Sequence, residues 1–295
     1  MMTEEFKLDI RNISKTYGNG VRALDEVSLT INKGMFGLLG PNGAGKSTLM
    51  RSIATLQAVD KGTMALGEID VLKDHDSIRR ILGYLPQDFG VYANVSAHNL
   101  LSHFATLKGI TDRRQRNETV DRLLHKTNLW NVRKKKLGSF SGGMKQRFGV
   151  AQALIGDPRL IIVDEPTAGL DPEERNRFLN LLSEIGENVI VILSTHIVED
   201  VSEVCNSMAI ISEGRVLRTG SPAETIAELE GKIWKMAVER GDLPALRDKF
   251  RIVGERLSAG KTYIHVYSDQ SPGDEFEQSS ADLRDVYFTT LRQVN

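Results

Sequence analysis

The 295-residue sequence predicts an α/β fold whose core sheet is mostly parallel. Two continuous apolar runs, 160–163 and 189–193, are typical of central strands that are covered on both faces. The predicted strands are separated by segments with helical apolar spacing, which implies parallel pairing through right-handed crossovers. We also expect an antiparallel edge subdomain, a helical subdomain and a small C-terminal α+β appendage.

The first part of the chain predicts the edge subdomain and the start of the core. Apolar and polar residues alternate over 6–10 and 27–31, which favours half-exposed antiparallel strands. The apolar run 36–39 predicts a buried strand. A helix is expected to follow over about 46–55.

The middle of the chain predicts the helical subdomain and further core strands. Residues 81–86 predict a short strand, and apolar positions three and four apart predict helices over 96–108 and 113–127. Ser141 is a candidate N-cap for a helix with one apolar face. That face carries Met144, Phe148, Ala151 and Ile155.

The character of the sequence changes near residues 220–222. Beyond them the charge density is high and the alternating strand patterns are short, as at 234–238. We therefore predict two domains, 1–222 and 223–295, of which the second is the small α+β appendage. The polar stretch 268–280 predicts a mobile loop within that appendage.

Composition excludes several classes of protein. The net charge is −1, so no overall basic field points to a nucleic-acid partner. The basic run 133–136 is interpreted as a solvated surface segment. The single cysteine, Cys205, excludes an intramolecular disulfide framework and suits a reducing compartment. A signal-peptide pattern and a bilayer-length apolar run are both absent, so we expect a soluble, intracellular protein.

The most informative motif is G-x-x-x-x-G-K-[ST], placed between the strand at 36–39 and the helix from Lys46. Its glycines let the backbone approach an anion, and its amides and the helix dipole favour phosphate. Lys46 adds a point charge for the β- and γ-phosphates, and the Ser47 hydroxyl suits Mg²⁺. This strand–loop–helix order is that of a P-loop NTPase. The expected nucleotide-binding residues are Gly40, Pro41, Asn42, Gly43, Ala44, Gly45, Lys46, Ser47 and Thr48.

The strand at 160–163 ends in two carboxylates, Asp164 and Glu165. Because side chains alternate along a strand, the two need not share a target. Asp164 suits an outer-sphere hold on Mg²⁺, and Glu165 suits polarising the attacking water as a general base. Such a pair alone could be two exposed acids that close a strand, but the phosphate loop upstream favours the catalytic interpretation.

A second candidate anion site lies in the segment 139–147. There Ser141, Gly142 and Gly143 offer a hydroxyl, two unobstructed amides and a helix dipole. This is the pattern of the signature sequence of ATP-binding cassette (ABC) ATPases, and residues 6 to about 225 resemble that family.

Further landmarks of the resemblance follow in the family's order. They are the adenine-stacking Tyr17, the strand-ending Gln87, the segment 168–171 and the switch histidine His196. The resemblance implies catalytic roles for Lys46, Gln87, Glu165 and His196, and Mg²⁺ contacts for Ser47, Gln87 and Asp164. Phe140 and Met144 replace the first and last residues of the commonest signature, Leu-Ser-Gly-Gly-Gln. The Ser-Gly-Gly is intact, so we expect function to be retained.

The resemblance also implies partners. One chain carries two anion sites, so a head-to-tail homodimer would hold each ATP and its Mg²⁺ between the Lys46 loop of one subunit and Ser141–Gly143 of the other. A single cassette without a membrane span resembles the ATPase subunits of bacterial export systems that work with an ABC-2 type permease. Such a subunit would be peripheral on the cytoplasmic face of the membrane.

The surface for that permease is expected in the segment 88–106, which carries Phe89, Tyr92 and Phe104. An ordinary place in the helical core is the alternative for Phe104. The C-terminal appendage fits the same group, but it could help dimerisation, bind a regulator or cover the edge of a sheet.

Two other functions are weighed against export. A soluble ABC protein acting on nucleic acid or ribosomes would usually carry two cassettes or long coiled-coil insertions, and the near-neutral charge also disfavours it. An unrelated P-loop kinase would leave Ser141–Gly143 and His196 without a role. The sequence therefore favours an ATP-hydrolysing export subunit.

Overall fold

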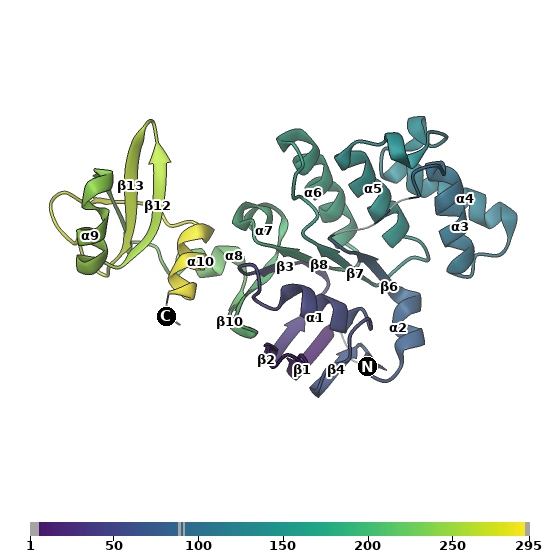
Figure 1. The fold of residues 1–295 in the computed structure, drawn as a ribbon, viewed down its shortest axis with the longest axis horizontal. Helices are drawn as coiled ribbons and strands as arrows, with labels where there is room; N and C mark the ends of the chain where they lie inside the picture. Colours follow the sequence, from purple (N-terminus) through teal and green to yellow (C-terminus); the bar gives the residue numbers. More distant parts are fainter. Residues whose placement is uncertain (1–5, 88–89, 91, 293–295) are drawn as a thin grey trace.

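The computed structural model describes residues 6–87, 90 and 92–292 (Figure 1). It contains three sheets, and helices cover both faces of the central one. The helical subdomain and the C-terminal sheet lie at opposite ends of the molecule. None of the described helices has the length and apolar character needed to cross a bilayer.

The central sheet has six strands in the order β10-β9-β3-β8-β7-β6. All run parallel except β10, which pairs antiparallel with β9 at one edge, so the predicted, mostly parallel core is confirmed. Every residue of β7 and β8 is buried, as their continuous apolar runs predict. The strands are β3 (Gly34–Leu39), β6 (Leu82–Leu85), β7 (Leu160–Asp164), β8 (Ile190–Thr195), β9 (Ser207–Ser212) and β10 (Arg215–Gly220).

An antiparallel sheet of the order β2-β1-β4-β5 forms the predicted edge subdomain. Its strands are β1 (Leu8–Thr16), β2 (Arg22–Ile31), β4 (Lys61–Leu66) and β5 (Ile69–Asp70). Helix α1 (Lys46–Ile53) lies between this sheet and the central one, because Leu49, Met50 and Ile53 share one apolar core with strands of both. Helix α2 (His75–Ile81) leads into β6.

The helical subdomain consists of α3 (Ala97–Leu107), α4 (Arg113–Lys126) and α5 (Gly142–Ala153), with 3₁₀ turns at Trp130–Val132 and Leu137–Ser139. Side-chain oxygens of Ser96, Asp112 and Ser141 accept hydrogen bonds from the first turns of α3, α4 and α5. The three helices enclose a separate apolar core around Phe148 and Leu101.

Helices α6 (Pro172–Gly186), α7 (Val198–Val204) and α8 (Pro222–Ala227) belong to the opposite face of the central sheet from α1 (Figure 1). Successive side chains of a strand point to opposite faces of the sheet, so alternate residues pack on different helices. Ile162 and Ile192 belong to the core around α1, whereas Ile161 and Val191 belong to the core around α6 and α7.

The C-terminal segment forms a four-stranded antiparallel sheet of the order β12-β13-β11-β14. Its elements are β11 (Ile233–Val238), a 3₁₀ turn at Arg240–Asp242, α9 (Leu243–Lys249), β12 (Ile252–Ser258), β13 (Lys261–Tyr267) and β14 (Glu277–Gln278). Part of the stretch 268–280 differs from the predicted loop. Residues 277 and 278 pair with β11, and the Phe276 side chain is buried in the core of this sheet.

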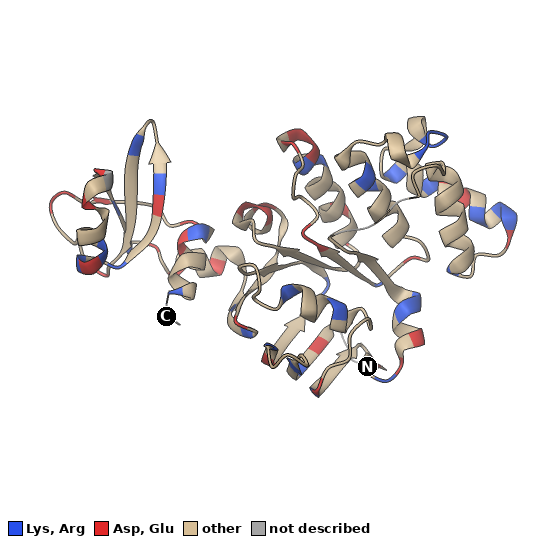
Figure 2. Cartoon of the chain, viewed as in Figure 1, with Lys and Arg blue, Asp and Glu red and all other residues tan. Residues whose placement is uncertain are grey.

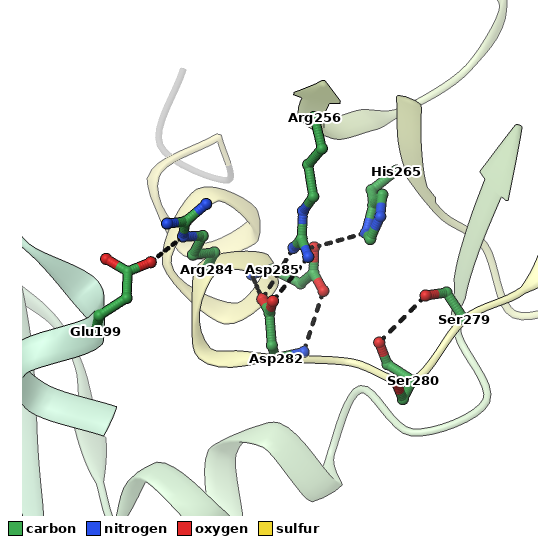
Figure 3. Close-up of polar contacts among 8 residues, drawn as sticks. All are labelled: Glu199, Arg256, His265, Ser279, Ser280, Asp282, Arg284 and Asp285. Carbon is green, nitrogen blue, oxygen red and sulfur yellow. Dashed lines mark hydrogen bonds and ion pairs between the residues drawn. The ribbon is translucent and has the colours of Figure 1, made fainter. Parts of the chain in front are cut away.

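Helix α10 (Leu283–Leu291) connects the C-terminal sheet with the central one. Towards the C-terminal sheet, Arg256 donates to both carboxylates of Asp282 and Asp285 over 2.8–2.9 Å, and His265 Nδ1 lies 3.1 Å from Asp285 Oδ1 (Figure 3). Towards α7, Arg284 pairs with Glu199 (Figure 3).

The same helix contributes apolar side chains to the core of the central sheet. Leu283, Val286 and Tyr287 are buried in one cluster with Val198 and Val201 of α7. Helix α8 begins at the expected domain boundary, and the residues that follow it, Leu229 and Ile233, belong to this cluster too. Both α8 and α10 therefore pack with the N-terminal part of the chain.

Candidate functional site

The phosphate loop runs from the end of β3 to the start of α1. Gly45 forms the N-cap of α1 with φ 102°. A Cβ on Gly45 would collide with the carbonyl oxygen of Ala23, and one on Gly40 would collide with that of Ile211. Gly43 has φ 82° and open space around its Cα. Glycine is thus required by close packing at two positions and by backbone conformation at two, 43 and 45.

The ammonium group of Lys46 lies inside this loop. Its side chain is 5% exposed, and Nζ donates hydrogen bonds to Gly40 O over 2.8 Å and Pro41 O over 3.2 Å. Glu165 Oε1 lies 3.5 Å from the same nitrogen. The loop therefore contains a buried positive charge at the N-terminal end of α1, which is a suitable arrangement for binding phosphate.

Glu165 is the meeting point of the predicted catalytic residues. Its backbone has φ 46°, an uncommon conformation for a non-glycine residue, and its amide donates to Ser194 O over 2.8 Å. Its carboxylate lies 3.2 Å from His196 Nδ1 and accepts from Gln87 Nε2 over 3.4 Å. With Lys46, three predicted residues thus contact one carboxylate.

Parallel strand order explains why these residues meet. Lys46 follows β3, His196 follows β8, Glu165 follows β7 and Gln87 follows β6. These strands are neighbours in the order β3-β8-β7-β6, so their carboxyl ends share one edge of the sheet. Ligands of open α/β sheets bind at that edge.

Asp164 and Ser47 form the expected place for Mg²⁺. Asp164 ends β7 and is 3% exposed, and within the described part of the chain its Oδ1 has no hydrogen-bond partner. A buried carboxylate oxygen without a donor is costly, and a hydrated divalent cation would satisfy it. Ser47 adds a hydroxyl oxygen next to Lys46. The residues present fit Mg²⁺.

Tyr17 lies beside the first turn of α1. Its hydroxyl is 3.1 Å from Thr48 Oγ1 and donates to Gln57 Oε1 over 3.1 Å. The ring is partly exposed, so its position is suitable for stacking against a base. Gln57 could not be predicted from the sequence, because no motif includes it.

The signature segment belongs to the helical subdomain. Ser141 caps α5, with Oγ accepting from Met144 N over 3.2 Å, and both Ser141 and Gly142 are exposed. A Cβ on Gly143 would collide with the Glu174 carboxylate. No hydrogen bond or ion pair among the described residues joins Ser141–Gly143 to the Lys46 loop. One chain therefore presents two separate candidate anion sites.

The two departures from the common signature have a structural reason. Phe140 is 5% exposed and belongs to the apolar core of the helical subdomain, and Met144 packs against that core from its edge. Large apolar side chains at both positions extend this core. Residue Ser194 was a missed neighbour of the site: it pairs with Asp164 in the sheet, and its buried Oγ also has no hydrogen-bond partner among the described residues.

Comparisons with known proteins place the chain in a family. Residues 24–168 match the family described as ABC transporter. The linearmycin resistance ATP-binding protein LnrL of Bacillus subtilis is 34% identical over 76% of this chain and 72% of its own length. The Nod factor export ATP-binding protein I of Cupriavidus metallidurans is 32% identical over 95% of both chains.

A solved structure shares the fold. The dimeric ATP-binding cassette MJ0796, in a post-hydrolysis state with ADP and Pi, superposes with a TM-score of 0.66 at 25% identity over 72% of this chain and 98% of its own. The residues that match the family, 24–168, contain the loop at Lys46 and the strand end at Glu165. The chain therefore belongs to the ABC transporter family and is one of its ATP-binding proteins, an ATP hydrolase.

Proposed function

We propose that the chain is the ATP-hydrolysing subunit of an exporter and drives a separately encoded permease through ATP-dependent, head-to-tail dimerisation. The observation that carries this proposal is the contact of Glu165 with Lys46, Gln87 and His196 at one edge of the sheet. The names of two relatives, a drug-resistance and an export ATP-binding protein, support the direction of transport.

Each residue at this edge has a proposed role in hydrolysis. Lys46 and the backbone N–H groups of the loop 40–48, except Pro41, which has none, bind the phosphates, and the ring of Tyr17 stacks on the adenine. Glu165 polarises the attacking water, a general-base contribution of about 10²–10⁴-fold in rate. His196 and Gln87, both within reach of the Glu165 carboxylate, orient that water and the γ-phosphate.

Mg²⁺ is the proposed metal cofactor. Ser47, Gln87 and Asp164 would hold it, Asp164 through water. When bound, the ion would neutralise charge on the phosphate oxygens.

Two copies of the chain are proposed to enclose two ATP molecules. Ser141, Gly142 and Gly143 of one subunit would bind the γ-phosphate held by Lys46 of the other. Each charge-assisted hydrogen bond contributes about 1.5–3 kcal/mol, so loss of the γ-phosphate weakens the closed dimer and lets it open. The dimeric relative with ADP and Pi supports such an assembly.

A groove between the helical subdomain and the central sheet is the proposed site for the permease. It has a volume of about 670 Å³ and is lined by α2, β6, α3 and α5, with Tyr84, Phe104 and Leu107 as apolar side chains. Leu107 at the end of α3 is 70% exposed, and Tyr92, in the segment before α3, is 68% exposed. Asp88 and Phe89 of the predicted contact segment lie outside the described residues.

This groove suits an amphipathic cytoplasmic helix of an ABC-2 type permease. The subunit would then be peripheral on the cytoplasmic face of the membrane. We further propose that residues 1–222 are the nucleotide-binding domain and 223–295 an accessory domain, joined to it through α8 and α10.

The test of this function is Glu165→Gln, which removes the base and keeps the size of the side chain. Turnover should fall by about 10²–10⁴-fold, while ATP affinity is kept and the dimer accumulates in ATP, measured by light scattering after gel filtration. Glu184→Gln, an exposed carboxylate on α6, is the matched control. Unchanged turnover in Glu165→Gln would contradict the catalytic assignment.

A further inference from the structure

Asp200 is a buried carboxylate to which the proposed mechanism gives no role. It lies on α7, four residues after His196, and is 0% exposed. A charge that is removed from water costs several kcal/mol unless donors surround it. Its donors therefore indicate what it does.

Three donors from three different segments converge on this carboxylate. Thr167 Oγ1, from the loop after Glu165, donates to Oδ2 over 2.5 Å. Thr195 Oγ1, at the end of β8, donates to the same oxygen over 3.3 Å. Arg175 Nε, from α6, donates to Oδ1 over 2.6 Å. Both threonines are almost fully buried.

Two of these donors flank the exposed segment 168–171. Thr167 precedes it, and Arg175 follows it on α6, whose N-cap is Asp171 with Oδ1 accepting from Glu174 N over 2.9 Å. Ala168, Gly169 and Asp171 are exposed, and Gly169 has φ 76°. Asp200 thus fixes both ends of a segment whose middle is free to contact a partner.

The third donor adjoins His196. Thr195 Oγ1 donates to Asp200 and also accepts from Ile197 N over 2.9 Å, so one hydroxyl bridges the two residues on either side of the histidine. The backbone of His196 is therefore held between β8 and the first turn of α7. The imidazole lies 3.2 Å from Glu165 as a result of this placement.

We propose that Asp200 is a positioning residue for hydrolysis: it fixes His196 relative to Glu165 and links that geometry to the segment 168–171. If the segment 168–171 contacts the second subunit of a dimer, a shift of this segment would change the position of His196 through their shared contact with the Asp200 carboxylate. The inference rests on the proposed function, because it requires that His196 takes part in hydrolysis and that two copies of the chain form a dimer. Positioning matters because a misplacement of 1 Å can cost about 100-fold in rate.

The direct test is Asp200→Asn, which keeps the size of the side chain and removes its charge and one acceptor. In the 295-residue protein kcat should fall about 10- to 100-fold. KM and equilibrium affinity for ATP should stay within about twofold, because no hydrogen bond among the described residues joins Asp200 to Lys46 or its loop. A merely structural role would change KM and affinity together with kcat.

Glu203→Gln is the matched control. Glu203 is on the same helix and accepts from the same Arg175 over 3.2 Å, but it is about half exposed and contacts neither threonine. The kcat of the Glu203→Gln variant should stay within about twofold of the wild-type value, as expected for the loss of an exposed ion pair. Equal losses in Glu203→Gln and Asp200→Asn would overturn the proposal.

A second pair of variants covers the case in which Asp200→Asn does not fold. Thr195→Val removes the bridging hydroxyl at nearly constant size, and Thr195→Ser keeps it. The kcat of Thr195→Val should fall while its affinity for ATP is unchanged. The kcat of Thr195→Ser should be close to the wild-type value. A wild-type kcat in Thr195→Val, with ATP bound normally, would overturn the positioning role.

His196→Ala separates this inference from the proposed function. A wild-type rate in His196→Ala would overturn the role of the histidine and, with it, the positioning role of Asp200. An impaired His196→Ala next to a fully active, folded Asp200→Asn would overturn only the role of Asp200.

Discussion

The ammonium group of Lys46 is bound by two carbonyl oxygens of its own loop and faces a carboxylate. The motif predicts the position of this lysine on the chain but not these contacts, which depend on side-chain rotamers and on the burial of the loop. The convergence on Glu165 was predictable in outline, because residues that follow adjacent parallel strands end at one edge. The distances were not predictable.

Replacing Lys46 tests the phosphate site at the residue scale. Lys46→Ala should weaken ATP binding by about 10- to 100-fold, which corresponds to the loss of one charge-assisted contact of about 1.5–3 kcal/mol. Titration calorimetry measures this effect. Lys33→Ala, at an exposed lysine directly before β3, should bind ATP like the wild type. Equal affinities in both variants would remove Lys46 from the site.

At the scale of elements, the sequence predicts best where one pattern decides the structure. The continuous apolar runs of β7 and β8, the helical spacing of α3 and α4, and the Ser141 cap are all confirmed. Helix α10 shows what was missing. For the residues from Leu283 onward, the sequence predicts only a place in a small α+β appendage. Their packing on α7 depends on a choice of partner between distant segments, which local patterns do not encode.

Shortening a buried side chain of α10 tests this contact. Leu283→Ala should lower the free energy of unfolding by about 2–5 kcal/mol, because Leu283 is 1% exposed in the core that it shares with Val198 and Val201. Urea unfolding measures the loss. Phe288→Ala on the same helix, where the side chain is 40% exposed, should cost clearly less. If Leu283→Ala and Phe288→Ala lower the free energy of unfolding equally, α10 does not complete that core.

At the scale of the whole molecule, the net charge of −1 is the sum of a basic part and an acidic part. Residues 92–158 contain twelve Lys and Arg against four Asp and Glu, a net +8, so the remainder of the chain carries −9. Figure 2 shows these basic residues on the helical subdomain. A head-to-tail pair would bring the basic part of one copy near the acidic remainder of the other, which favours association.

Mixing two inactive variants tests the head-to-tail arrangement. Lys46→Ala removes the phosphate loop's charge, and Ser141→Arg obstructs the signature. Each variant alone should lose most of its ATPase rate, and the mixture should recover part of it, because the heterodimer contains one intact site formed by the unaltered loop of one copy and the unaltered signature of the other. A phosphate-release assay measures the rates. No recovery in a mixture shown to associate would exclude shared sites.

The path of the chain through α10 has a consequence for synthesis. Helix α7, which begins two residues after His196, leaves the ribosome long before residues 283–291, yet its apolar face is covered by them. Until that later helix arrives, the nascent nucleotide-binding part exposes an incomplete core at the side next to its histidine. An exposed apolar surface of this kind is one that chaperones bind, and it is covered once the distal sheet has folded and placed α10.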